Sequence, residues 1–367
     1  FSLSGAALGN ALDQLSGEAA TGAPTAGFQS MGQFLSLMTG PLGGFHNPNP
    51  FGNASGFAPE QKLSPEAASA YAAVTPTDRA GSSFGSRWGV WASAYGGSNK
   101  TDGESEVLGS HNINAQVFGI AAGASYRVSP DTTLGFALGG GGTHWGLAGN
   151  LGSGRSDMFQ AGIYGAHKMG AAYVSAALGY GWHRMSTDRT VTLSGNDNLT
   201  AGFNAQNFGG RLEAGYRLAM QAVDVTPYAA LRAQSFHTPS YAETAASGSG
   251  TFALAYGAKT TTATRTELGA RFDKMVAVTP KTALTLHARA AWAHDGNTGR
   301  SASAAFQSLS SPSFTVNGAV GASDLALVSA GAEMRLARNV TIGAKFEGEF
   351  SGASSSYGGN GSIRYGW

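Results

Sequence analysis

The feature that most constrains the fold of this sequence is a two-residue alternation that begins near Arg87 and continues to Trp367. Around residues 208–218, one parity carries Arg211 and Glu213 among glycines, whereas the other parity is aliphatic and aromatic. Successive side chains of a β-strand point to opposite faces of the sheet. The alternation therefore predicts strands with one apolar face and one charged face.

The same division recurs along the later strands. The charged parity contains Arg211, Glu213, Arg217, Arg265, Glu267, Arg271, Asp273, Glu333, Arg335, Lys345 and Glu347. An arginine or lysine that faces lipid at the bilayer midplane costs about 2–4 kcal/mol. We therefore expect these residues to line the lumen of a membrane barrel, where charges of opposite sign neutralise one another, while the apolar parity faces lipid.

The alternation divides into twelve strand candidates, an even number as in bacterial single-chain barrels. They lie near residues 87–97, 114–128, 132–146, 156–168, 171–187, 203–218, 223–237, 262–278, 282–294, 325–337, 339–351 and 355–367. The sequence thus predicts an all-β membrane fold, a twelve-stranded antiparallel transmembrane β-barrel.

The connections between these candidates alternate in length. Short turns are expected near 129–131, 169–170, 219–222, 279–281 and 338, and long polar or glycine-rich loops near 98–113, 147–155, 188–202, 238–261 and 295–324. Such parity is typical of a barrel whose two sides differ, with short periplasmic turns and longer extracellular loops.

Composition narrows the function classes. Charged residues are 12% of the chain, about half the usual share of a soluble protein. The longest apolar runs are too short for a helical membrane span. A formal net charge of +1 gives no field that would favour nucleic acid. There is no cysteine, the histidines have no metal-binding spacing, and we expect no cofactor.

The first 40 residues differ from the rest because their apolar residues recur at helical spacing. Leu15 belongs to a first stripe, and Phe28 and Phe34 to a second, which Gly40 ends. We interpret residues 1–40 as a helical segment, 41–85 as a Gly/Pro/Ser-rich linker and 86–367 as the barrel. The helical segment either packs on a neighbour or lies inside the barrel. Because the chain begins at Phe1, without a signal peptide, we expect a fragment or a processed form.

Four stretches resemble those of a known family. Residues 11–18 (ALDQLSGE) resemble the start of its pore helix, and residues 87–97 (RWGVWASAYGG) its first strand. Residues 208–217 (FGGRLEAGYR) and 363–367 (IRYGW) resemble a middle strand and the last strand. Together they identify the chain as similar to the translocator domain of classical autotransporters, the type V secretion family.

The resemblance implies a barrel with a pore helix in its lumen, to which we assign Leu15, Glu18, Phe28 and Phe34. It implies transport of an N-terminal passenger to the surface of a Gram-negative bacterium, from a monomeric barrel in the outer membrane. The implied partners are the passenger, outer-membrane lipids, lipopolysaccharide and the barrel-assembly machinery, which would read Ile363, Tyr365 and Trp367 as an assembly signal. Family members that cut themselves use an Asn-Asn pair on the helix, and residues 1–40 contain only Asn10.

Two alternatives remain open. One is an outer-membrane barrel enzyme, a phospholipase or a protease, but the Gly-x-Ser-x-Gly match at residues 81–85 lies in the expected linker rather than at a strand-to-helix turn. The other is a solute pore or a barrel that binds through its loops. We expect a translocator without enzymatic activity.

Overall fold

The computed structural model describes residues 4–40, 87–104, 108–193, 195–279, 282–309, 312–336 and 339–367. The expected linker, including the Gly-x-Ser-x-Gly match, lies outside these ranges, as do parts of the turns near residues 280 and 338. Within the described ranges, no helix is both long and apolar enough to cross a membrane.

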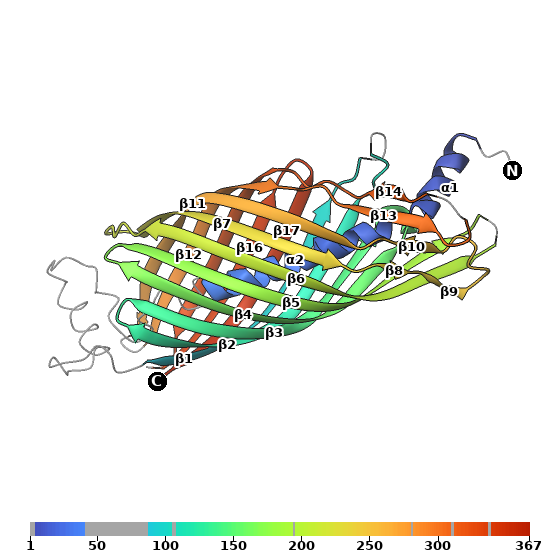
Figure 1. Cartoon of the computed structure of the whole chain (residues 1–367). Helices are drawn as coiled ribbons and strands as arrows, with labels where there is room; N and C mark the ends of the chain where they lie inside the picture. The colour runs from blue at the N-terminus through green and yellow to red at the C-terminus, as the bar shows by residue number, and fades with distance from the viewer. Residues whose placement is uncertain are drawn as a thin grey trace, which may run out of the picture.

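Twelve antiparallel strands form a closed barrel, which confirms the predicted fold class (Figure 1). They are β1 (Trp88–Thr101), β2 (Ile113–Ser129), β3 (Thr132–Leu147), β4 (Ser153–Met169), β5 (Ala172–Val191), β6 (Asp197–Tyr216), β7 (Asp224–Thr238), β11 (Lys259–Thr279), β12 (Thr282–Gly296), β15 (Asp324–Arg335), β16 (Val340–Phe350) and β17 (Ser354–Gly366). Pairing of β1 with β17, from Gly89↔Gly366 to Thr101↔Ser354, closes the ring.

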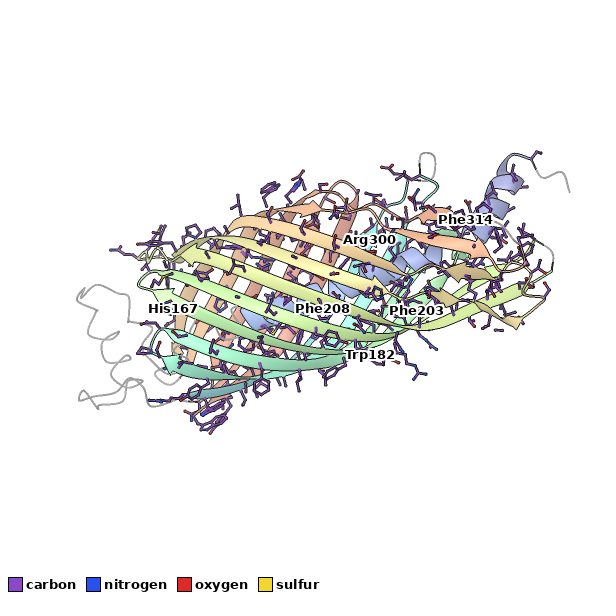
Figure 2. All side chains as sticks on the ribbon, in the orientation of Figure 1. His167, Trp182, Phe203, Phe208, Arg300 and Phe314 are labelled. Carbon is purple, nitrogen blue, oxygen red and sulfur yellow. The ribbon has the colours of Figure 1, made fainter. Side chains whose placement is uncertain are left out.

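The wall has an apolar outer face. On β6, Phe208 and Leu212 are 54% and 51% exposed, whereas Arg211 between them is 6% exposed. Figure 2 shows Phe208 and Trp182 on the outer surface of the wall. Tyr365 and Trp367 near the chain end are also exposed, so the alternation read from the sequence corresponds to an outer apolar parity and a buried one.

The chain before the barrel forms α1 (Ala6–Ser16), the 3-10 helix η1 (Glu18–Thr21) and α2 (Gly22–Thr39). α2 runs inside the barrel, and α1 projects beyond the mouth where the long loops gather (Figure 1). Gly17, at a φ of 70°, lies at the junction between α1 and η1, and a side chain there would meet Tyr256. The barrel end with the chain's carboxyl terminus lies opposite α1 (Figure 1).

The long connections contain more structure than the sequence predicted. Residues 238–261 and 295–324 are not simple loops: β8 (Tyr241–Ala242), β10 (Leu254–Tyr256), β13 (Ser301–Phe306) and β14 (Phe314–Asn317) form a separate four-stranded sheet. β9 (Thr244–Ser247) pairs with the extended end of β6, and η3 (Ala148–Asn150) follows β3. The sheet forms because it buries apolar side chains against η1 at the mouth.

Candidate functional site

The candidate site is the barrel interior, and α2 occupies it through two different faces. The apolar face holds Met31, Phe34, Leu35 and Met38, each 0% exposed. They pack in one cluster with inward side chains of the wall, among them Trp91, Tyr95, Val117, Met158 and Tyr164. α2 thus packs along the half of the wall that runs from β1 to β7.

Glycines in this half of the wall make room for the helix. A Cβ atom at Gly209 on β6 would lie 2.6 Å from Cγ of Met31, and one at Gly162 would lie 2.7 Å from Cε of Met38. Only a residue without a side chain allows the backbone of the wall to approach the helix so closely. The helix itself has a matching glycine, because a Cβ at Gly27 would meet the ring of Phe236 at 2.3 Å.

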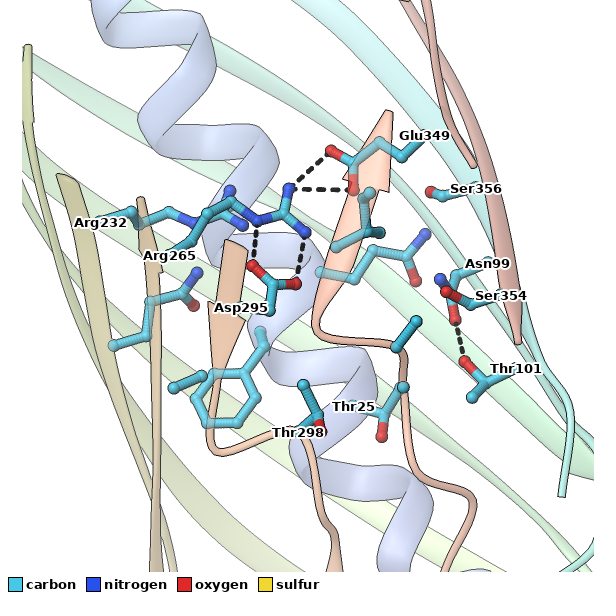
Figure 3. Close-up of a pocket in the computed structure, with 18 of the residues that line it drawn as sticks. Thr25, Asn99, Thr101, Arg232, Arg265, Asp295, Thr298, Glu349, Ser354 and Ser356 are labelled. Carbon is cyan, nitrogen blue, oxygen red and sulfur yellow. Dashed lines mark hydrogen bonds and ion pairs between the residues drawn. The ribbon is translucent and has the colours of Figure 1, made fainter. Parts of the chain in front are cut away.

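The second face of α2 is polar and borders a cavity of about 190 Å³ (Figure 3). Thr25, Gln29, Gln33 and Ser36 line the cavity from the helix side. The opposite side is formed by neutral polar and charged residues of the wall, including the Arg265 and Glu349 pair drawn in Figure 3. The helix therefore covers one half of the inner wall tightly and leaves polar space along the other half.

One buried network joins β6 to β11. Arg211 donates to both carboxylate oxygens of Glu267, at 2.8 Å each, and to Glu213 at 3.0 Å. Arg271 donates to both oxygens of Glu213 at 2.7 Å, and its guanidinium lies 4.0 Å from the ring centre of Tyr228. These bidentate pairs satisfy charges that would be costly to bury alone.

A second network lies nearer the loop end of the barrel. Arg265 donates to Oδ2 of Asp295 at 2.7 Å and to Glu349 at 2.8 and 2.9 Å. Arg289 lies 3.8 Å from both Glu267 and Glu347, so it joins the first network to the pair of Glu347 and Lys345. Lys345 donates to Glu347 at 2.8 Å.

The other predicted lumen residues are placed more peripherally. Arg217 follows the end of β6 and pairs with Asp224 while 35% exposed, and Asp273 contacts His287 at 2.6 Å. Glu333 and Arg335 are half-buried on β15, and within the described ranges neither forms an ion pair. The structure thus places Arg211, Glu213, Glu267, Arg271, Lys345 and Glu347 in one network and Arg265 in another. Arg217 and Asp273 instead contact Asp224 and His287.

The four residues assigned to the pore helix divide between two places. Phe28 and Phe34 lie in α2 and are 8% and 0% exposed. Glu18 begins η1 and accepts hydrogen bonds from the backbone N–H of His111 at 2.8 Å and from its ring at 2.7 Å. Leu15 lies in α1 and packs beside Val191, Leu199 and Ala253, at the loop ends of β5 and β6.

Sequence reasoning missed the contacts that hold the helical segment at the mouth. Arg189 makes a bidentate pair with Glu243 at 2.7 Å and also donates to the carbonyl oxygen of Gln14. The Tyr256 hydroxyl donates to the carbonyl of Gly17 at 3.2 Å, and the Trp145 indole donates to the carbonyl of Ala19 at 2.9 Å. The partners are far apart in sequence and follow no periodic pattern, so no signal in the chain identifies them.

Arg300 belongs to the loop between β12 and β13 and lies at the end of the cavity. Its guanidinium is 4.8 Å from the ring centre of Phe28 and donates to the carbonyls of Asn297 and Gly299. Burial lowers the pKa of Arg300 to about 10, which leaves it charged at neutral pH. Among the described residues, no group of three or more histidines and acids is placed to hold a metal ion.

Comparison with known proteins gives consistent matches. The family model described as autotransporter beta-domain matches residues 90–347. An extracellular serine protease of Serratia marcescens is 27% identical over 266 residues, which are 72% of this chain and 24% of that protein. The chain therefore spans about a quarter of the length of that relative.

Two solved structures share the fold. The translocator domain of the autotransporter NalP from Neisseria meningitidis has a TM-score of 0.60 at 14% identity, covering 76% of this chain and 88% of that one. The beta domain of the Bordetella autotransporter BrkA has a TM-score of 0.58 at 18% identity, covering 77% of this chain and 100% of that one.

Proposed function

This chain belongs to the autotransporter beta-domain family, and from that premise we propose that it carries an N-terminal passenger through its barrel to the surface of a Gram-negative bacterium. The observation that carries the proposal is the direction of the helical segment. α2 enters the barrel interior, and the chain towards the amino terminus leaves through the mouth where the long loops gather. A passenger joined ahead of α1 would begin on the loop side, which faces the exterior in outer-membrane barrels.

In this proposal, the chain has three parts: a pore-helix segment (1–40), a linker (41–85) and the translocator barrel (86–367). The lumen lining is Arg211, Glu213, Arg217, Arg265, Glu267, Arg271, Asp273, Glu333, Arg335, Lys345 and Glu347. The buried pairs of Arg211 and Arg271 support the assignment, because bidentate pairs hold charge inside a wall whose outer surface is apolar. Of the predicted pore helix, Phe28 and Phe34 would fill the interior, while Leu15 and Glu18 would hold the segment at the mouth.

The proposed partners are the passenger, outer-membrane lipids and lipopolysaccharide, and the barrel-assembly machinery. Ile363, Tyr365 and Trp367 on β17 are 52%, 44% and 50% exposed, so their side chains are accessible for recognition as an assembly signal. The barrel closes on itself through β1 and β17, and we propose that it acts as a monomer.

A reporter-fusion experiment tests the proposal. The same protease-sensitive reporter domain is joined either ahead of Phe1 or after Trp367, and intact cells of a Gram-negative host are treated with protease. We expect the amino-terminal reporter to be degraded and the carboxyl-terminal reporter to be protected until the outer membrane is opened. Protection of the amino-terminal reporter, with a folded barrel in the membrane, would contradict passenger transport.

A further inference from the structure

The four-stranded sheet at the mouth is a separate unit from the wall. Among the described residues, β8, β10, β13 and β14 pair only with one another and form no ladder with a wall strand. Figure 1 shows them beyond the end of the wall, on the side where α1 leaves the barrel. We call these four strands the lid.

The lid is fixed to the barrel on one side. β9 follows β8 and pairs with the end of β6, and Glu243 between β8 and β9 is held by Arg189 of β5. On the other side, the hairpin of β13 and β14 is joined to the wall by residues 297–300 and 318–323. These two connections contain three glycines, Gly299, Gly318 and Gly321. Because glycine can adopt most backbone conformations, the hairpin side can turn relative to the wall at low cost.

The hairpin side of the lid covers η1. All four residues of η1 are at most 8% exposed, but neighbouring residues face different partners. Ala19 packs in a cluster with inward side chains of the wall, including Trp145. Ala20 packs in another cluster with side chains of the lid, Leu254, Tyr256, Ala304 and Val316. η1 is therefore enclosed between the wall and the lid.

Two close contacts hold the lid on this segment. The Tyr256 hydroxyl lies 3.2 Å from the carbonyl oxygen of Gly17. The Cβ position of Gly318 lies 2.7 Å from Cβ of Thr21, so only a residue without a side chain allows this approach. The lid thus fits the backbone of one chain, the helical segment itself.

The closed lid leaves too little space for a second chain. At about 30 Å³ per water, the cavity of about 190 Å³ beside α2 has room for roughly six waters. The 18 residues of α2 are about 27 Å long, and an extended chain beside them would need about eight residues. The loop end of the cavity is lined by both connections of the hairpin, through Thr298, Arg300, Ala319, Gly321 and Ala322. Movement of the lid would therefore enlarge the cavity at this end.

We propose that the lid turns away from η1 while a passenger chain passes beside α2, and closes on η1 when the passenger has left. The proposal rests on the proposed function, because it assigns the mouth sheet a role in passenger transport. The closed arrangement is then the state after transport. In this state the lid holds the helical segment between itself and the wall.

Amide hydrogen exchange of the purified whole chain tests whether the lid moves as a unit. We expect the amides of β10 and β13 to exchange at one common rate, at least tenfold faster than those of α2. Tyr256→Phe should speed exchange in the lid by about fivefold, which corresponds to one lost hydrogen bond, and should leave α2 unchanged. The matched control is Tyr180→Phe, on the outward parity of β5, whose hydroxyl has no hydrogen-bond partner among the described residues.

A stalled reporter tests whether the lid opens during transport. The reporter is joined ahead of Phe1, and its amino-terminal half folds in the periplasm and stops transport midway. A membrane-impermeant maleimide is then added to intact cells that carry Ala20→Cys. We expect labelling of Ala20→Cys with the stalled reporter, and at least tenfold slower labelling with a fully transported one. Ala23→Cys, at a residue 0% exposed in the wall cluster, should stay protected in both, and Leu12→Cys, at a residue 58% exposed, should react in both.

Three results would overturn the proposal. They are exchange in the lid that is no faster than in α2, exchange that Tyr256→Phe leaves at the wild-type rate, or protection of Ala20→Cys while the reporter is stalled. External protease that cuts the carboxyl-terminal half of the reporter, but not the folded half, shows that the chain is stalled in the barrel. If neither half reaches the surface, passenger transport itself fails, and with it the role of the lid in transport. The exchange measurement on the purified chain does not depend on that result.

Discussion

Replacing Glu213 with glutamine should destabilise the folded barrel by about 3–5 kcal/mol, the usual cost of removing one partner from a buried ion pair. The Glu213 side chain is 0% exposed and accepts hydrogen bonds from Arg211, Arg271 and the hydroxyl of Tyr173. Arg211 would keep its bidentate pair with Glu267. Arg271 would lose its carboxylate partner and keep only neutral contacts, with Tyr173, the Tyr228 ring and the one amide oxygen of the new glutamine, so most of the cost should come from this arginine.

Urea unfolding of the purified barrel in lipid vesicles measures the effect. The matched control is Glu333→Gln, the same chemical change at a half-buried residue that forms no ion pair among the described residues, and it should change stability by less than about 0.5 kcal/mol. In a double-mutant cycle, Glu213→Gln with Arg271→Met should cost less than the sum of the two single changes, with a coupling of about 1.5 kcal/mol or more. A loss at Glu213 no larger than at Glu333, or additive single effects, would refute the reasoning.

Three further changes test the contacts that hold the helical segment in the barrel. Phe34→Ala should lower the free energy of unfolding by about 3–5 kcal/mol because it leaves a cavity under α2, and it should speed protease cleavage of the helical segment. Leu12→Ala, at a side chain that is 58% exposed, should do neither. Equal cleavage rates in the two variants would contradict the packing. Arg189→Leu should make the mouth of the barrel sensitive to protease because it leaves Glu243 buried without its charged partner. Adding Glu243→Leu should restore part of the resistance to protease. If the second change restores none, the ion pair does not hold the mouth. Trp145→Phe removes one hydrogen bond to the helical segment and part of a fully buried ring, so it should lower the unfolding free energy by at least about 1 kcal/mol. An unchanged unfolding midpoint would exclude that role.

The strands of the wall were predictable because lipid imposes one rule on every strand. Phe208, Leu212 and Leu268 had to be apolar on the lipid side, and the residues between them were free to be charged. This rule fixes the face of each residue, and the turns and loops between the alternating stretches give the number of strands. The resemblance to autotransporter translocators is likewise confirmed by the family match.

The structure at the mouth was not predictable from the same rule. β8, β10, β13 and β14 are short, lie beyond the lipid-facing wall and take their stability from η1, which is more than 200 residues earlier in the chain. Arg189 and Glu243 meet only because the ends of β5 and β6 extend past the barrel rim. The cavity beside the polar face of α2 was not predictable either. The helical spacing of apolar residues indicates which side of the helix is buried, but not that a cavity borders the other side.

The central claim is that α2 lies inside a barrel whose charged parity faces it and whose apolar parity faces lipid. The most direct measurement is disulfide formation in the outer membrane of intact cells between Met31→Cys and a cysteine on either face of β6. We predict near-complete cross-linking with Gly209→Cys, on the inward parity, and none with Leu212→Cys, whose native side chain is 51% exposed on the outer face. Cross-linking with Leu212→Cys, or none with Gly209→Cys in a folded barrel, would contradict the account.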